Sequence, residues 1–373
     1  MWKALPVALG GLGVPSAASR AAPAFLASVV DTLDTQERFF RGPEMPEVRP
    51  DFFSTLEAFA ATYSTPADPV TVEVLQHARK TQQWLARLVD VAAHKRLLES
   101  VDERTQAVMR SASLSYSGGF ITLPPWPHLR IPTVGFRMLL RYRLGLPLLG
   151  PVPGPAEVRL ERCPLCRKDE LDRFGDHAAS CRDAAHPTKR HDAVAGRLAS
   201  IMRATRICVR QEAAGIVDGR RRPADVLIHG LSARPWCVDV LVSCPTVRSH
   251  RAAAAREAGA ASVPGIREKH RKYADFIAQR NYKYSVLALE TTGGFAPSAS
   301  HFLKVAASVM AVPPSERVPG GGADMDEDAL DRRGAAQRLG CTLSIAFQQA
   351  WARTLELCYP AAFVPPAMRV GQG

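Results

Sequence analysis

The sequence predicts an α+β protein, in which a helical N-terminal region precedes a mixed sheet flanked by helices. Two observations carry this prediction. Apolar residues return every three or four positions over 70–110, and β-branched residues alternate in short runs after residue 207. A stiff Pro- and Gly-rich linker at 150–155 separates the two patterns. A chain of 373 residues is also expected to form two or three units.

These patterns set the expected boundaries along the chain. We expect a helical region over 1–150, a metal knuckle over 156–186, a sheet domain over 187–312, a disordered linker over 313–334, and a C-terminal helix and tail over 335–373. The helical region should contain helices over 22–33 and 52–63, then a helical run over 70–110 with a break near Ser100. A further helix is expected over 133–144.

The composition bounds the class of protein. A net charge of +12 favours a polyanionic partner such as nucleic acid, although a basic protein that is merely soluble shows the same excess. No apolar run approaches the roughly 18 residues of a membrane helix. The first residues look like a signal peptide, but Pro6, Gly10, Gly11 and Gly13 interrupt the apolar stretch. With only eight cysteines, the chain is not a disulfide scaffold, so we expect an intracellular protein.

A group of cysteines and one histidine has metal-ligand spacing. The motif is C-x2-C-x10-H-x3-C, formed by Cys163, Cys166, His177 and Cys181. Three thiolates and one imidazole suit a tetrahedral Zn²⁺, and a closed four-ligand site should be structural. The alternative is a chance CxxC in a reducing compartment. His186 and His191 are spare ligands if the set is shifted.

A basic amphipathic helix is expected at 189–205, directly after the knuckle. Val194, Leu198 and Ile201 should face inward. The residues expected to contact nucleic acid are cationic, namely Lys189, Arg190, Arg197, Arg221 and Arg222.

Two aspartates flank a predicted hairpin at 221–245. Asp225 precedes the apolar run of the first strand, and Asp239 lies inside the alternating second strand. A carboxylate in an apolar strand costs free energy unless a cation pairs with it. The two could hold one Mg²⁺ or Mn²⁺. The alternative is an Asp that caps a turn and a solvent-facing Asp on an edge strand.

The neighbouring elements complete an α-β-β-β-α-β order. A strand over 207–210 is followed by Glu212. A helix over 263–279 carries Lys269 and Lys272 on one face. A buried strand then ends at Glu290.

The order Glu212, Asp225, Asp239, then Lys269 or Lys272 resembles the PD-(D/E)xK restriction-like nucleases. With the Cys-Cys-His-Cys knuckle upstream, the segments RRPAD, VDV and KxxKY look like the C-terminal part of site-specific non-LTR retrotransposon polyproteins. Those carry a reverse transcriptase, a zinc knuckle and a restriction-like endonuclease. The segment GGLGVPSAASRAAPAFLAS at 10–28 is similar to the region after the polymerase in such polyproteins.

The resemblance implies a metal-dependent DNA endonuclease that nicks one strand. It also implies that the partner is DNA, or RNA as well, and that the protein is nuclear. Asp225 and Asp239 would bind catalytic Mg²⁺ or Mn²⁺, Glu212 would be a supporting acid, and Lys269 or Lys272 would stabilise charge at the phosphate. The alternatives are a non-catalytic zinc-knuckle nucleic-acid-binding protein and an inactive retroelement remnant.

The chain departs from the family pattern at several positions. Leu241 stands where the usual lysine follows Asp239, and Ala224 separates the expected Pro-Asp pair. The knuckle spacing is longer than is common in the group. No Tyr-x-Asp-Asp polymerase motif occurs, so the resemblance predicts a tail without its polymerase.

Overall fold

The computed structural model describes residues 2–39, 48–122, 127–148, 162–181, 185–211, 224–310 and 325–360. Contacts divide the chain into two compact units, Met1–Val101 and Asp102–Gly373. This division falls well before the linker at 150–155 that was expected to separate the domains. Each unit is therefore described by itself.

The first unit is helical. Its elements are the 3-10 turns η1 (Trp2–Ala4) and η2 (Val7–Leu9) and the helices α1 (Ala17–Phe39), α2 (Val48–Tyr63), α3 (Val72–His77) and α4 (Thr81–Ser100). Leu26, Phe52, Phe59 and Leu85 form its apolar core. Arg20 ties α1 to α4 through both carboxylate oxygens of Asp90, at 2.8 and 2.9 Å. The helical run predicted over 70–110 has the expected break after Ser100 and an earlier one between α3 and α4.

The second unit begins with helical elements. They are α5 (Glu103–Ala112), α6 (Gly119–Thr122), the 3-10 turn η3 (Pro127–Leu129) and α7 (Thr133–Arg143). The Ser111 hydroxyl lies 2.7 Å from that of Thr292, and the Tyr142 hydroxyl lies 2.7 Å from that of Thr291. These buried contacts join residues that are far apart in sequence, which explains why the unit boundary precedes α5.

A four-stranded mixed sheet forms the centre of the described part of this unit, so the α+β prediction is confirmed. Its strands, in spatial order, are β1 (Cys208–Gln211), β2 (Val226–His229), β3 (Trp236–Ser243) and β4 (Lys283–Glu290). The pairs β1–β2 and β2–β3 are antiparallel, and β3–β4 is parallel. The β3–β4 crossover contains α10 (Arg248–Arg256), the 3-10 turn η4 (Ala260–Ser262) and α11 (Val263–Arg280).

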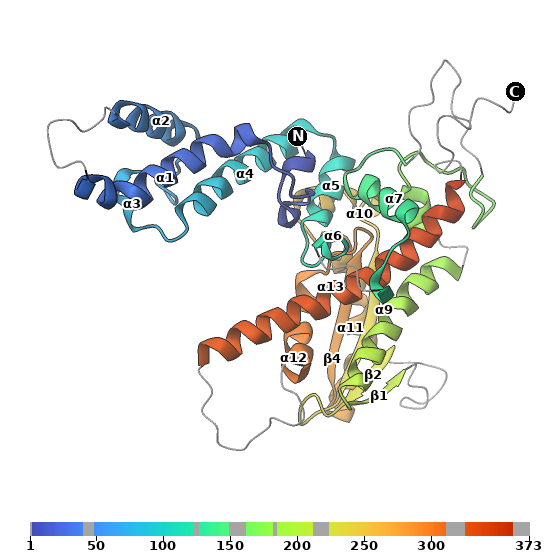
Figure 1. Ribbon diagram of the computed structural model, residues 1–373. Coiled ribbons are helices and arrows are strands. Elements are labelled where there is room, and N and C mark those ends of the chain that lie inside the picture. The colour runs from blue at the N-terminus through green and yellow to red at the C-terminus, as the bar shows by residue number, and fades with distance from the viewer. Residues whose placement is uncertain are drawn as a thin grey trace, which may run out of the picture. The chain divides into compact units, whose positions relative to one another are not determined.

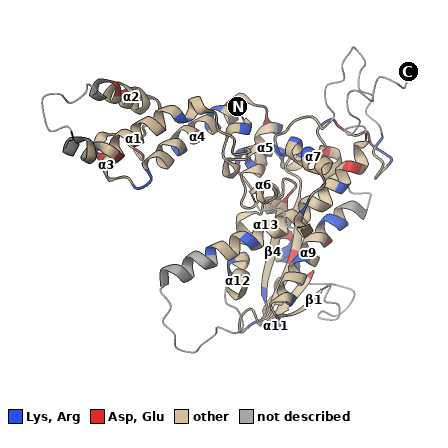
Figure 2. Ribbon diagram, in the orientation of Figure 1, with Lys and Arg blue, Asp and Glu red and all other residues tan. Residues whose placement is uncertain are grey.

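Helices cover both faces of the sheet. On one face, Val238, Val240 and Leu287 pack in the main core with residues of α9 (Ala185–Ala204), α12 (Ser300–Met310) and α13 (Met325–Cys358). The helices α9 and α13 contact each other beside the strands (Figure 1). The opposite face carries Cys237 and Val286, which pack in smaller clusters with side chains of α11. Lys and Arg occur on several helices of this unit, α9 among them (Figure 2).

The structure adds helices that the sequence patterns did not predict. Neither α10 nor α12 was expected, although α10 contains the four-residue run Ala252–Ala255 and Ala is the best helix former. The expected disordered linker over 313–334 lies partly outside the described residues, and its last part, from Met325, belongs to α13. No helix among the described residues is long and apolar enough to span a bilayer.

Candidate metal centres

The Cys3His motif forms one cluster in the structure. Cys163 and Cys166 lie on a tight turn, in which the Arg167 amide donates to the Cys163 carbonyl at 2.8 Å. His177 belongs to the short helix α8 (Asp176–Ser180), and Cys181 caps its C-terminal end. The ligand atoms of all four residues lie within 4.8 Å of one another. This arrangement can hold a metal ion and is compatible with structural zinc.

The surroundings of the cluster favour metal binding. Backbone amides of Asp169 and Lys168 lower the pKa of Cys166 to about 6, and the thiolate is the form that binds metal. His177 Nε2 lies 3.4 Å from Cys166 Sγ. The backbone amide of His177 donates to Asp172 Oδ2 at 2.5 Å.

The spare ligand His191 lies in a different cluster, and the side chain of His186 is outside the described part.

The second cluster follows from the strand register. Val226 pairs with Val238, and the Asp225 amide donates to the Val238 carbonyl at 3.0 Å. Extending this register by one residue places Asp225 opposite Asp239. Residues paired across two strands point to the same face of a sheet. The hairpin therefore brings its two carboxylates together, on the face that α11 covers.

Cations and hydrogen-bond donors surround these two carboxylates. Lys269 Nζ lies 2.6 Å from Asp239 Oδ1, and the Tyr284 hydroxyl donates to Asp239 Oδ2 at 3.0 Å. His191 Nε2 lies 2.8 Å from Asp225 Oδ2, which also accepts the Val240 amide at 2.6 Å. Ligand atoms of His191, Asp225 and Asp239 all lie within 4.8 Å of one another.

The proximity of the two carboxylates separates their pKa values. Burial and the neighbouring Asp225 carboxylate raise the pKa of Asp239 to about 6, although Lys269 opposes this shift. Burial also acts to raise the pKa of Asp225, but the bonds from His191 and the Val240 amide lower it to about 2. Burial acts to lower the pKa of His191, whereas Asp225 and Asp192 raise it to about 9. Two adjacent carboxylates that are paired with cations can instead bind one divalent ion between them.

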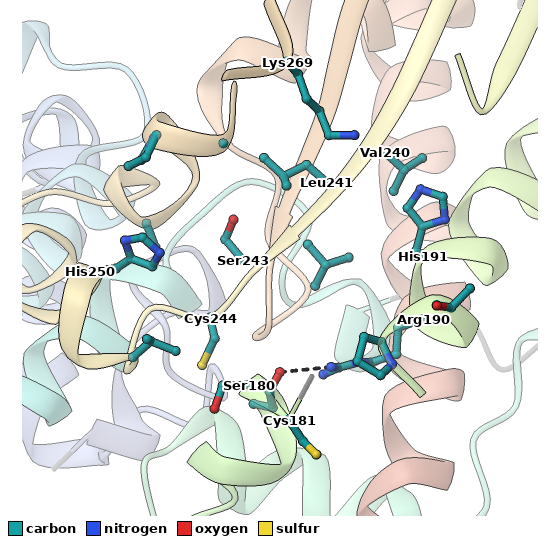
Figure 3. Close-up of a pocket in the computed structure, with 18 of the residues that line it drawn as sticks. Ser180, Cys181, Arg190, His191, Val240, Leu241, Ser243, Cys244, His250 and Lys269 are labelled. Carbon is teal, nitrogen blue, oxygen red and sulfur yellow. Dashed lines mark hydrogen bonds between the residues drawn. The ribbon is translucent and has the colours of Figure 1, made fainter. Parts of the chain in front are cut away.

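A cavity of about 980 Å³ adjoins this cluster. Its lining includes Asp225. Lys269 of α11 and His191 of α9 also line it, along with Val240 and Leu241 of β3 (Figure 3). The cavity gives a ligand access to the carboxylate of Asp225 and to the amine of Lys269.

The structure distinguishes between the two candidate lysines. Lys269 contacts Asp239 directly, whereas Lys272 is exposed and its amine lies 5.1 Å from the centre of the Tyr273 ring. Of the two, Lys269 alone joins the cluster.

One residue predicted to bind nucleic acid has a different place. Arg190 is 2% exposed, donates from Nη2 to the Ala179 carbonyl at 2.9 Å, and stacks over Trp351. It lies four residues before Val194 on the inward stripe of α9, which is why it is buried instead of facing solvent. The prediction that Arg190 forms part of a cationic surface is therefore wrong.

The other predicted surface residues divide into two groups. Lys189 is exposed and Arg197 is half-buried on α9. Arg221 and Arg222 lie outside the described residues, as does Glu212, the predicted supporting acid.

Sequence reasoning missed two members of the cluster. His191 was considered only as a spare zinc ligand, because nothing in the spacing connects it to Asp225, which lies 34 residues later. Tyr284 was placed on a buried strand, but its hydroxyl contact with Asp239 depends on the β3–β4 pairing.

Comparison with known proteins gives no further identification. No protein-family model matches the chain, and no curated protein matches it. The resemblance to retrotransposon polyproteins accordingly stays a prediction.

Proposed function

We propose that the Asp102–Gly373 unit is a metal-dependent DNA endonuclease with a restriction-like fold, derived from the C-terminal part of a non-LTR retrotransposon polyprotein. The observation that carries the proposal is the convergence of Asp225, Asp239 and Lys269 at one hairpin. A DNA-cleaving role would also agree with the expected nuclear location.

Each member of the cluster has a distinct task in this proposal. Asp225 and Asp239 would hold Mg²⁺ or Mn²⁺, and such an ion supplies charge neutralisation at a phosphate and acidifies water. Lys269 would turn its amine towards the phosphate and oppose the negative charge that develops there. The Tyr284 hydroxyl holds Asp239 in place from the opposite oxygen, at 3.0 Å. The cavity beside the cluster gives the DNA backbone a route to these groups.

In the same proposal, the Cys3His cluster binds structural zinc. The hydrogen bond from Arg190 to the Ala179 carbonyl connects α9 to α8, which carries His177. Because His191 follows Arg190 on α9, an ion at the Cys3His cluster would help to fix the helix that reaches Asp225. Exposed cations such as Lys189 would supply attraction to the phosphate backbone.

Nicking of supercoiled plasmid DNA tests the proposal. The full chain is incubated with zinc retained and with Mg²⁺ or Mn²⁺, and nicked product is followed with time. Wild type and the control Asp275→Asn, which changes an exposed carboxylate, should nick at similar rates. The nicking rate of Asp239→Asn should fall at least about a hundredfold, because the substitution removes one metal ligand and one negative charge. Equal rates for all three proteins would rule out this mechanism.

A second candidate is a non-catalytic nucleic-acid-binding protein. One observation favours it, namely that both carboxylates have cationic partners within the fold, Lys269 and His191. Such pairs can serve stability alone. Salt-dependent DNA binding that Asp225→Ala leaves unchanged, together with no ion-dependent nicking, would support this candidate instead.

A further inference from the structure

His191 extends the hairpin cluster from two oxygen donors to a mixed set. We propose that His191 is the third protein ligand of the ion held by Asp225 and Asp239, and that the site takes Mn²⁺ in preference to Mg²⁺. This inference rests on the proposed function, because it takes the two carboxylates as metal ligands, and it deepens that function by naming the ion.

The spacing of the donors fits a single ion. His191 Nε2 lies 2.8 Å from Asp225 Oδ2, and the ligand atoms of the three residues lie within 4.8 Å of one another. An octahedral ion with bonds of about 2.1 Å holds its donors roughly 3 to 4.2 Å apart. Small rotations of the side chains would bring the three donors onto one ion.

The second ring nitrogen of His191 has the partner that metal-binding histidines usually have. Its Nδ1 lies 2.9 Å from Asp192 Oδ1. A ligating histidine commonly donates its other N–H to a carboxylate, which fixes the ring and leaves the opposite nitrogen for the metal. Asp192 thus turns Nε2 of His191 towards the two hairpin carboxylates.

The elements that carry the three residues are well anchored. Val194 and Leu198 of α9 and Val226 and Val238 of the hairpin all belong to one apolar core. His191 lies three residues before Val194 on the same helix. The imidazole is therefore held at the carboxylates by packing and not by a flexible loop.

The donor chemistry then determines the preferred ion. Mg²⁺ is typically bound by oxygen ligands and keeps several waters. Mn²⁺ also favours oxygen ligands, but as a transition-metal ion it accepts an imidazole nitrogen beside them more readily than Mg²⁺ does. A site of two carboxylates and one imidazole should therefore bind Mn²⁺ more tightly than Mg²⁺.

Electron paramagnetic resonance of Mn²⁺ tests this inference without measuring cleavage. The zinc-loaded full chain is titrated with Mn²⁺, Mg²⁺ affinity is obtained by competition, and pulsed measurements detect imidazole nitrogen coupled to the bound Mn²⁺. Three variants are compared with wild type. His191→Glu makes an all-oxygen site, and Asp225→Asn removes a carboxylate ligand. The control His229→Ala removes an exposed imidazole at the far end of β2.

We expect wild type and His229→Ala to bind Mn²⁺ about tenfold or more tightly than Mg²⁺, with nitrogen coupling. His191→Glu should still bind Mn²⁺ but lose the coupling and most of the preference over Mg²⁺. Asp225→Asn should weaken binding of both ions.

Two other outcomes would overturn the inference, and they are distinguishable. Mn²⁺ binding that depends on Asp225 but shows no nitrogen coupling would mean that His191 is only the counter-ion of that carboxylate, and the proposed function would stand. Failure of wild type to bind either ion more tightly than Asp225→Asn would remove both the inference and the proposed function.

Discussion

Glu290 is a buried acid outside the metal clusters, and it should make the stability of the second unit depend on pH. The residue ends β4, is 1% exposed, and its Oε1 has no hydrogen-bond partner among the described residues. Burial raises its pKa to about 7, although bonds from Ser111 and the Ala261 amide oppose the shift. The folded chain therefore binds the Glu290 proton more tightly than the unfolded chain does.

The sign and size of the effect follow from this difference. The fold favours the protonated carboxyl of Glu290. Its contribution to the free energy of unfolding is therefore fully present below pH 4.5 and is lost as the pH rises through 7. At 1.36 kcal/mol per pKa unit, the loss amounts to about 3 kcal/mol by pH 8. Glu290→Gln, which stays neutral, should unfold with a free energy similar to that of wild type at pH 5 and higher by up to about 3 kcal/mol at pH 8.

Urea unfolding followed by circular dichroism from pH 5 to pH 8.5 measures this difference. Glu257→Gln, at an exposed position, is the matched control. Its free energy of unfolding should differ from that of wild type by the same amount at every pH. A constant difference between Glu290→Gln and wild type across this range would refute the reasoning. So would a lower stability of Glu290→Gln at all pH values, since that would mean that the bonds to the carboxylate outweigh its burial.

Three further predictions concern the two clusters and the first unit. Lys269→Met should reduce the plasmid nicking rate about 10²- to 10³-fold, whereas Lys272→Met should change it less than about tenfold, because Lys269 is the one of the two that contacts Asp239. Cys166→Ser or removal of zinc by a chelator should lower the melting temperature of the second unit, and re-addition of zinc should restore only the wild type. Leu85→Ala, at a fully buried position, should lower the unfolding free energy of the first unit by about 2–5 kcal/mol in urea titrations and leave zinc binding unchanged.

The hairpin was the most predictable part of the site. An apolar run before a Gly- and Pro-containing turn and alternating apolar residues after it predict two strands, and the pairing that results brings Asp225 and Asp239 together. Four ligands at metal-binding spacing likewise predicted the Cys3His cluster. In both cases the information lies within some 20 residues of chain.

The remaining features depend on contacts between distant segments. Lys269 and Lys272 are separated by less than one helical turn, so the choice between them depends on how α11 lies on β3, where Gly265 approaches the side chain of Leu241 closely. Arg190 was misplaced because its charge was given more weight than its position on the inward stripe of α9. The unit boundary before α5 has no local signal in the sequence, because it depends on contacts such as that between Ser111 and Thr292.

The two hairpin carboxylates, Asp225 and Asp239, are proposed to bind one divalent ion. Anomalous diffraction from crystals of the full chain soaked in Mn²⁺ tests this proposal most directly. We predict one anomalous peak within about 2.3 Å of a carboxylate oxygen of both Asp225 and Asp239, which Asp239→Asn abolishes. Fully soaked crystals with no peak there, and with the bonds from His191 and Lys269 to the two carboxylates intact, would contradict it.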